Sequence, residues 1–287
     1  MSPKGEREKT GENRGRYPYA HSLYIEGDMK TLIDTGAGRE LEQLFGKTEQ
    51  VLLTHYHRDH VTHNPAFENA RFAIHQLDAP GVESLEGFYR LSGLDQVDVE
   101  AYWKMVRQAG FIPTSIHSYL EDGDYLDTGR YRLQTLHLPG HTGGHCGFLI
   151  EEYGLLFAAD LDITSFGPWY GNTTSDPDQF RSSIERVRSL KPEILVTGHH
   201  RPVTKKIDLI LENYGKILDQ RDDRIITALK EKPMTLKALA AENIIYKAHH
   251  GQEVLIFFEK VMIEKHLKSL NKRGIVVNNQ GVYYLRR

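Results

Sequence analysis

The stretch THYHRDHVTH, residues 54–63, places His55, His57, Asp59 and His60 within six consecutive positions. Imidazole nitrogens and carboxylate oxygens are both ligands of zinc and of neighbouring divalent metals. Alternate residues of an extended segment point to the same side, so His55 and His57 can bind one ion while Asp59 and His60 turn toward a second. A solvated, histidine-rich turn is the alternative, because the chain has 15 His, but four such residues in one short run favour a metal site.

Three apolar residues, 51–53, come directly before this stretch and are typical of a buried strand. The candidate ligands would then follow a strand end, where a rigid scaffold holds functional loops. The stretch also has the spacing HxHxDH, and in this it resembles the metallo-β-lactamase superfamily. In that family the remaining ligands are a His, an Asp and a His, each on a loop that follows a strand.

Three later motifs of this chain resemble those ligand loops. LHLPGHTGGH offers His141, LLFAADLD offers Asp160 and LVTGHHRPV offers His199. Near the N-terminus, LIDTG with Asp34 resembles the first motif of the family, whose carboxylate supports the ligands without binding metal itself. The resemblance covers residues 17–205.

This resemblance implies a site for two divalent ions. His55, His57 and His141 would hold the first ion, Asp59, His60 and His199 would hold the second, and Asp160 would bridge them. Zinc is the first expectation, and iron or manganese are alternatives. Two such ions activate a shared water near neutral pH and polarise the bond that it attacks, so Asp59 and Asp160 are candidate catalytic residues as well as ligands.

Two departures from the family pattern affect this assignment. His200 follows His199 where glycine is common, so either histidine could be the last ligand. His199 is favoured because it directly follows Gly198, as the family's ligand follows its glycine. Ala159 stands where glycine often precedes the ligand Asp.

The composition is that of a globular protein without a membrane-spanning segment. Of the 287 residues 39% are hydrophobic and 26% are charged, and the longest apolar runs are far shorter than a membrane span. Residues 1–16 carry charges and glycines without an apolar stretch, which predicts a disordered tail and not a signal peptide. The single cysteine fits a cytoplasmic location. Cys146 begins the apolar run CGFLI, so we expect it in the core and not as a ligand or nucleophile.

Strand-like runs and helix patterns over residues 17–205 predict an α/β (α+β) fold, and the resemblance implies its form, an αββα sandwich of two mixed sheets between helix layers. Residues 78–118 interrupt this pattern with a helical insertion rich in large apolar side chains. Tyr102 and Trp103 within the insertion are candidates for a substrate wall, and Trp169 and Tyr170 of FGPWYG are candidates for lining the pocket. Helices packed on the sheet and an ordinary packed turn are the respective alternatives.

After residue 205 come a long helix pattern over 207–229, two shorter helices and two β runs, an order that resembles a winged helix-turn-helix module. Residues 206–287 carry 15 Lys and Arg against 10 Asp and Glu, a net charge of +5, which leaves −8 for the rest of a chain whose total is −3. Lys265, Lys268 and Lys272 gather on one helix face. Such a module can bind nucleic acid or form a homodimer, but a lysine-rich face is usually only solvated, and the modest charge favours solvation.

The loop of Asp160 resembles the glyoxalase II-like, lactonase-like and nuclease-like branches of the family. The best-known antibiotic-hydrolysing subclass lacks this loop and uses a cysteine ligand. The expected function is therefore metal-dependent hydrolysis of a small-molecule ester, thioester or lactone. A single-strand endoribonuclease is the alternative, because a water activated by two ions can attack carbonyl carbon or phosphorus. A persulfide dioxygenase with one iron, which shares HxHxDH, is the third hypothesis.

Overall fold

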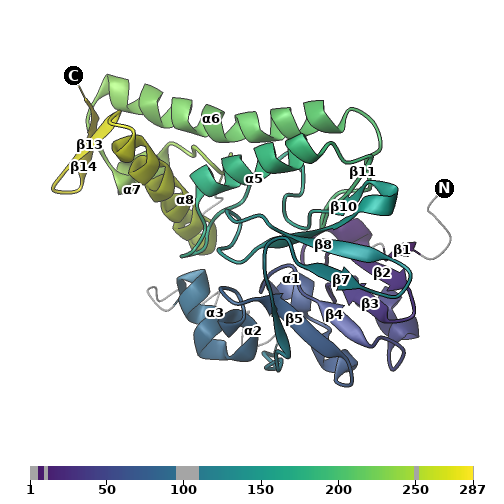
Figure 1. The fold of residues 1–287 in the computed structure, drawn as a ribbon. Helices are drawn as coiled ribbons and strands as arrows, with labels where there is room; N and C mark the ends of the chain where they lie inside the picture. The colour runs from purple at the N-terminus through teal and green to yellow at the C-terminus, as the bar shows by residue number, and fades with distance from the viewer. Residues whose placement is uncertain (1–5, 10–11, 95–109, 249–251, 287) are drawn as a thin grey trace.

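Two mixed β-sheets lie face to face in the computed structural model, which describes residues 6–9, 12–94, 110–248 and 252–286 (Figure 1). The first sheet, in the order β1-β2-β3-β4-β5-β6, consists of β1 Glu6–Lys9, β2 Ser22–Glu26, β3 Lys30–Ile33, β4 Gln50–Leu52, β5 Arg71–His75 and β6 Ser118–Leu120. The second, in the order β11-β10-β9-β8-β7, consists of β7 Tyr125–Asp127, β8 Arg132–His137, β9 Cys146–Ile150, β10 Leu155–Phe157 and β11 Ile194–Val196. Strands β3 to β6 run parallel, as do β10 and β11, and the other neighbours are antiparallel.

Both faces of the central strands of each sheet are buried. Leu52 of β4 joins the cluster between the two sheets, while its neighbour Val51 faces the helices outside the first sheet. Leu155 and Phe157 of β10 also join the cluster between the sheets, while Leu156 faces the helices outside the second sheet. Because side chains alternate along a strand and both sides are covered, these strands appear in the sequence as unbroken apolar runs. Each such buried side chain contributes about 1.5–3 kcal/mol to folding.

Helices cover the outer face of each sheet, so the layers follow the order αββα, and the predicted fold is confirmed (Figure 1). Outside the first sheet lie η2 Gly38–Leu44, α2 Pro80–Glu83 and α3 Leu85–Ser92, and the short helices α1 Arg58–Val61 and η3 Asn64–Phe67 follow β4. Outside the second sheet, α5 Pro177–Leu190 and α6 Ile207–Glu231 run side by side. The short 3-10 helices η1 Glu12–Gly15 and η5 Glu151–Tyr153 lie in loops.

Helix α5 begins where the motif SDPDQF predicts. The side chain of Asp176 accepts hydrogen bonds from the backbone N–H groups of Asp178 and Gln179, and Pro177 occupies the first helical position, where its missing N–H costs nothing. The helix ends at Lys191, whose backbone is left-handed. This helix leads the chain from the loop after Asp160 to β11, which precedes His199.

The start of the chain differs from the disordered tail that its composition predicts. Residues Glu6–Lys9 form β1, which pairs antiparallel with β2 at the edge of the first sheet, and Glu12–Gly15 form η1. Of the predicted insertion 78–118, α2 and α3 pack on the first sheet. Tyr102 and Trp103 lie outside the described residues.

The C-terminal unit, residues 206–286, continues from α6 through β12 Met234–Thr235, α7 Leu236–Ala241, α8 Glu253–Lys272, β13 Val276–Asn279 and β14 Val282–Leu285. Its small sheet has the order β12-β14-β13. These helices and strands follow the predicted order, and their assignment as a winged helix stays a prediction. Buried side chains of α8 and of α6 belong to the same apolar cluster as α5 and the outer face of the second sheet, so the unit packs directly on the two-sheet sandwich.

The lysines of α8 do not form the free basic face that the sequence predicts. Lys265 is half-buried and donates hydrogen bonds to the backbone carbonyls of Thr173 and Ser175, and burial lowers its pKa to about 8. Lys268 pairs with Glu264 one turn earlier on the same helix. The prediction failed for Lys265 because helical periodicity cannot show which loop of the two-sheet sandwich lies against α8.

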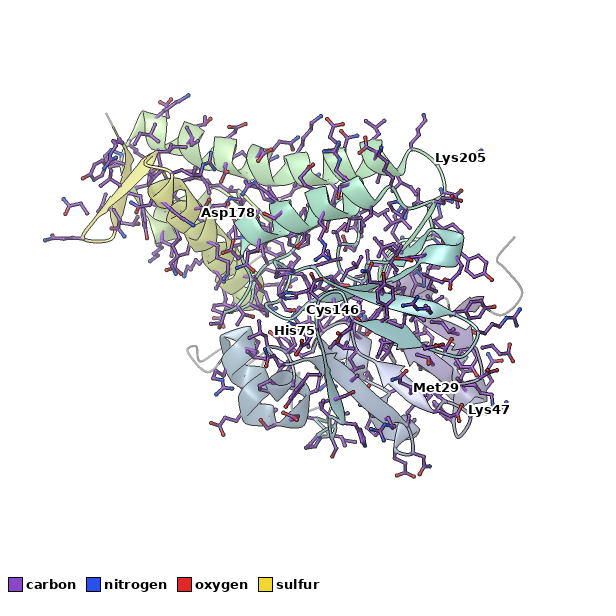
Figure 2. All side chains as sticks on the ribbon, in the orientation of Figure 1. Met29, Lys47, His75, Cys146, Asp178 and Lys205 are labelled. Atoms are coloured by element: carbon purple, nitrogen blue, oxygen red, sulfur yellow. The ribbon has the colours of Figure 1, made fainter. Side chains whose placement is uncertain are left out.

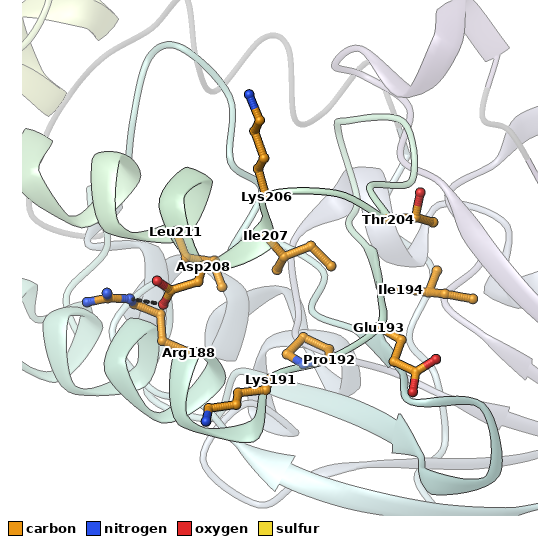
Figure 3. Close-up of a pocket in the computed structure, with 10 residues that line it drawn as sticks. All are labelled: Arg188, Lys191, Pro192, Glu193, Ile194, Thr204, Lys206, Ile207, Asp208 and Leu211. Atoms are coloured by element: carbon orange, nitrogen blue, oxygen red, sulfur yellow. Dashed lines mark hydrogen bonds and ion pairs between the residues drawn. The ribbon is translucent and has the colours of Figure 1, made fainter.

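A surface pocket of about 620 Å³ lies where α5 ends and α6 begins (Figure 3). Its walls include Lys191, Pro192, Lys206 and Leu211, and Arg188 pairs across it with Asp208. None of the predicted metal ligands lines this pocket. Among the described residues, no helix has the length and apolar character that crossing a membrane requires.

Candidate metal centre

The loops that carry the predicted ligands meet at one edge of the sandwich because of strand direction. Parallel β3 and β4 end together, which brings Asp34 next to the stretch that begins at Thr54. In the second sheet, β8, β10 and β11 all run in one direction, since β9 is antiparallel to both β8 and β10. The loops after these three strands carry His141, Asp160 and His199. His55 and His199, which are 144 positions apart in the sequence, thus lie at the same edge.

The first ligand group comprises His55, His57, His141 and Asp160. Nε2 of His141 lies 3.3 Å from Nε2 of His55 and 2.9 Å from Nδ1 of His57, and 3.2 Å from Oδ2 of Asp160. The candidate ligand atoms of the group all lie within 4.8 Å of one another. This is the separation expected of donor atoms around a single ion at about 2.0–2.2 Å from each.

The second ligand group comprises Asp59, His60 and His199. Nε2 of His199 lies 3.2 Å from Oδ2 of Asp59 and 3.4 Å from Oδ1 of Asp160, and Nε2 of His60 lies 2.9 Å from the same Oδ1. The two oxygens of Asp160 therefore face different groups, with Oδ2 toward the first and Oδ1 toward the second. His200 is turned away, because its Nδ1 contacts the carbonyl of Arg201.

The outer nitrogen of each ring has its own partner, and in the four rings whose outer nitrogen donates, the inner nitrogen is left free to accept. Nδ1 of His60 donates to Asp34 at 2.7 Å, and Nδ1 of His55 contacts the Thr54 hydroxyl, which itself donates to Asp34. Nδ1 of His141 donates to the carbonyl of Trp169, and Nδ1 of His199 donates to that of Gly15. Nε2 of His57 lies 2.5 Å from the side-chain amide of Asn172. Partners of this kind orient metal-binding imidazoles.

The donor set fits a metal ion on two observations. Nε2 of His60 and Oδ1 of Asp160 are buried and have no hydrogen-bond partner, although they lie 2.9 Å apart. Buried polar atoms rarely lack a partner, and an ion between them would bind both. In addition, burial lowers the pKa of His141 to about 3 and that of His57 to about 4, so both rings are neutral and can coordinate at neutral pH.

The carboxylates of the centre require positive charge. Burial alone would lower the pKa of His60, but Asp160 and Asp34, on opposite sides of its ring, raise it to about 10. A proton or a metal cation can supply this charge. The Asp160 carboxyl likewise has its pKa held well below the usual value, because the surrounding histidines outweigh the effect of burial.

Residues 18–199 match the sequence profile of the Metallo-beta-lactamase superfamily. The chain belongs to this superfamily. The match spans the sandwich from the N-terminal segment to the last candidate ligand. It leaves out the C-terminal unit.

Curated relatives align with this chain over different shares of its length. The chain is 28% identical over 244 residues to the probable metallo-hydrolase YqjP of Bacillus subtilis, covering 74% of this chain and 76% of that protein. It is 25% identical to a hydroxyacylglutathione hydrolase of Aeromonas hydrophila over 63% of this chain and 57% of that protein. It is 23% identical to the atrochrysone carboxyl ACP thioesterase AacuM of Aspergillus aculeatus over 92% of this chain and 78% of that protein.

Solved structures of superfamily members share the fold. The metallo-beta-lactamase family protein TTHA1429 from Thermus thermophilus superimposes with a TM-score of 0.76 at 22% identity, covering 100% of both chains. TTHA1623, solved in a di-iron-bound form, has a TM-score of 0.52 at 30% identity over 66% of this chain and 92% of its own. The first comparison extends through the C-terminal unit.

The departure at Ala159 from the superfamily pattern has a structural explanation. Its backbone is left-handed, with φ 42°, a conformation that glycine adopts without steric cost. The turn presents Asp160, whose backbone N–H donates to Nε2 of His145 at 3.2 Å. Asp34, with φ 58°, is left-handed as well. Alanine tolerates this backbone at modest cost, so the centre keeps its geometry without the glycine.

Trp169 and Tyr170, both predicted to line the pocket, differ in where their side chains lie. The ring centre of Trp169 lies 5.6 Å from that of His57 and 5.7 Å from that of His141, so this residue borders the first ligand group. Tyr170 is fully buried, and its hydroxyl contacts His266 and Arg221 in the core. The prediction for Tyr170 was wrong because the next side chain along an irregular segment points the opposite way.

Residues that the sequence did not indicate also contact the ligands. Asn172 lies against His57, and the Ser175 hydroxyl donates to the carbonyl of His141 at 2.6 Å. His145 accepts from the backbone of Asp160 and donates through Nδ1 to the carbonyl of Leu138. Of these three residues, only His145 could have been predicted from the sequence, since it follows His141 within one glycine-rich motif. Asn172 and Ser175 lie in a segment that contains no motif pointing to contact with a ligand.

Cys146 lies at the start of β9 in the middle of the molecule (Figure 2). It is fully buried, its thiol contacts the carbonyl of Gly144, and burial raises its pKa well above the usual value. A thiol in this state is neither a nucleophile nor a ligand. It belongs to neither ligand group.

Cys146→Ser is therefore expected to keep the metal content of the unmodified protein and most of its activity. The smaller, more polar hydroxyl should lower the free energy of unfolding by about 1–2 kcal/mol, because the site is buried. Elemental analysis and thermal unfolding measure the two effects. Loss of metal from a folded Cys146→Ser protein would show that the thiol is a ligand.

Proposed function

We propose that this chain is a hydrolase that holds two divalent ions and cleaves a small-molecule thioester, ester or lactone. The observation that carries the proposal is the orientation of Asp160, whose two oxygens face the two ligand groups. A carboxylate between two donor sets is the arrangement expected of a bridging ligand. Seven donor residues also exceed what one tetrahedral ion takes up.

The roles of the residues follow from their positions. His55, His57 and His141 would hold one ion, Asp59, His60 and His199 the other, and Asp160 would contact both. When bound, the ions supply Lewis acidity that activates water and polarises the carbonyl of the substrate. Asp34 keeps the His60 ring oriented by accepting a hydrogen bond from its Nδ1. Zinc is proposed first, and iron is the alternative because TTHA1623 binds two iron ions.

The proposed substrate class rests on the surroundings of the first ligand group. Trp169 borders that group, and the ring of Phe258 on α8 lies 5.2 Å from the Trp169 ring. An apolar wall beside the ions suits the carbon chain of an acyl group. The names of two relatives, a hydroxyacylglutathione hydrolase and an acyl-carrier-protein thioesterase, also support thioester cleavage. The net charge of −8 outside the C-terminal unit disfavours a polyanionic substrate.

Single-strand RNA cleavage is the competing hypothesis. Its sequence basis was the lysine face of α8, and Lys265 is bound to backbone carbonyls while Lys268 is paired. Lys272 is exposed. The structure thus weakens the basis for a backbone-binding surface on this helix.

We expect the purified, metal-loaded protein to hydrolyse members of a panel of acyl thioesters, esters and lactones. We expect it to leave single-stranded RNA and DNA intact. Lys268→Glu with Lys272→Glu is the matched variant, because neither lysine contacts the centre, and it should hydrolyse the acyl substrates at the unmodified rate. Metal-dependent RNA cleavage that falls steeply with salt and disappears in the double variant, without acyl turnover, would establish the nuclease instead.

A further inference from the structure

Segment 166–175 supplies the outer contacts of His57 and His141, two members of the first ligand group. The carbonyl of Trp169 accepts from Nδ1 of His141 at 2.9 Å, and the Ser175 hydroxyl donates to the His141 carbonyl at 2.6 Å. Asn172 contacts Nε2 of His57 at 2.5 Å. Two of the three histidines of this group are therefore oriented by one short segment.

The second ligand group obtains its outer contacts elsewhere. Asp34, at the end of β3, orients His60, and Gly15, in the N-terminal segment, orients His199. Among the described residues, no hydrogen bond or ion pair joins segment 166–175 to either of these histidines. Segment 166–175 thus supports His57 and His141 of the first group and neither histidine of the second, while Asp34 contacts His60 directly and His55 through Thr54.

Segment 166–175 has no helix or strand of its own and is held from outside by α6. Arg221, which is buried, donates to the carbonyls of Phe166 and Pro168 and to the hydroxyl of Tyr170. These are three charge-assisted hydrogen bonds from one guanidinium, of the stronger kind found in proteins. They fix both the backbone before Trp169 and the residue after it.

Helix α8 contacts the same segment as well. The Tyr170 hydroxyl donates to Nε2 of His266 at 2.5 Å, and Nδ1 of His266 donates to Asp222 at 2.6 Å. Lys265 donates to the carbonyls of Thr173 and Ser175. The chain of contacts runs from α8 through segment 166–175 to the imidazoles of the first group, because Tyr170 directly follows Trp169.

We infer that the C-terminal unit is a positioning device for the first ligand group, and that Tyr170, Arg221, His266 and Lys265 set the affinity of that group for its ion without touching it. The inference rests on the two-ion site of the proposed function. It does not depend on the substrate, because binding of an ion is measured without one. Loss of outer contacts of metal-binding histidines typically costs 10- to 100-fold in affinity.

The test uses variants in which only one ligand group is intact. Zn²⁺ affinity of each metal-free protein is measured by competition with a chromophoric chelator. His199→Ala leaves the first group intact, and His57→Ala leaves the second. Tyr170→Phe removes only the hydroxyl that meets His266 and Arg221. In the His199→Ala background we expect it to weaken Zn²⁺ binding roughly tenfold, and in the His57→Ala background by less than about twofold.

Ile225→Val is the control for general loss of stability. Ile225 is fully buried on α6, one turn after Arg221, and this change typically costs about 0.5–1.5 kcal/mol, close to the loss of a buried hydroxyl contact. It should leave Zn²⁺ binding unchanged in both backgrounds. Lys265→Met, at a half-buried position of α8, is a second test variant. Like Tyr170→Phe, it should weaken Zn²⁺ binding in the His199→Ala background more than in the His57→Ala background.

Equal weakening in both backgrounds, or no weakening in the His199→Ala background, would overturn the inference. If Tyr170→Phe fails to fold, as circular dichroism would show, the result with Lys265→Met decides. Failure of the unmodified chain to bind Zn²⁺ or Fe²⁺ at all would instead refute the proposed metal site. None of these measurements uses thioester turnover. An error in the proposed substrate would therefore not change the result for the positioning role.

Discussion

Asp160→Asn is expected to lower the metal content of the purified protein from close to two ions per chain to about one or fewer, and to reduce hydrolysis by more than about 100-fold. The carboxylate places Oδ2 3.2 Å from His141 and Oδ1 2.9 Å from His60, so it contacts both ligand groups. An amide keeps one oxygen and replaces the other with a nitrogen that does not bind metal. It also removes a negative charge that would offset the two proposed dications.

Asp162→Asn is the matched control for this experiment. Asp162 lies two residues further on and accepts hydrogen bonds from Thr164 and from the hydroxyl of Tyr214, but it belongs to neither ligand group. Its amide can still accept through one oxygen, so metal content should not change. Elemental analysis and turnover of an activated thioester measure both variants. One tightly held iron, with content unchanged in Asp160→Asn, would favour the mononuclear dioxygenase.

Gly198→Ala is expected to disrupt the centre even though the added group is a single methyl. A Cβ at this position would lie 2.8 Å from Oδ1 of Asp160 and 2.9 Å from Cε1 of His60. Both neighbours are fixed by their own contacts, so the methyl must displace a ligand or the β11 loop. We expect metal affinity to fall by more than about tenfold and the free energy of unfolding to fall by about 1–3 kcal/mol.

Gly215→Ala tests whether any added methyl has this effect. Gly215 lies within α6, where a Cβ would meet Ile184 at 3.6 Å, an ordinary contact. Alanine favours the helix over glycine by about 0.5–1 kcal/mol, so this variant should unfold at higher temperature and keep its metal. Calorimetry and chelator competition on the two proteins give the comparison. Full metal binding by Gly198→Ala would show that the loop after β11 adapts.

Much of the fold could be predicted because its signals are local. The motif SDPDQF contains both the cap and the first-turn proline of α5, so its start could be found within one turn. The strand at Arg71–His75 is a short apolar run bounded by polar residues, and β5 has those same limits. The sequence could not reveal that β1 adds to the first sheet. Its pairing with β2 depends on an edge that exists only after the sheet has formed.

By itself the sequence determined the kinds of donor atom and their order along the chain, because HxHxDH and the three later loops carry them in short motifs. It left His199 and His200 open as alternatives, since adjacent residues differ only in the direction of their side chains. In the tertiary structure His199 faces Asp59, whereas the ring of His200 contacts the carbonyl of Arg201.

Apart from Asp34, only the tertiary structure decided which residues orient the ligands. Asn172 meets His57 across 115 positions, and Lys265 meets Thr173 across 92, distances at which no periodicity of the sequence carries information. Trp169 and Tyr170 are adjacent and both aromatic, yet Trp169 borders the centre and Tyr170 is buried in the core. Their roles follow from how α6 and α8 pack on segment 166–175, because packing of remote parts sets the direction of each side chain in a segment without regular hydrogen bonding.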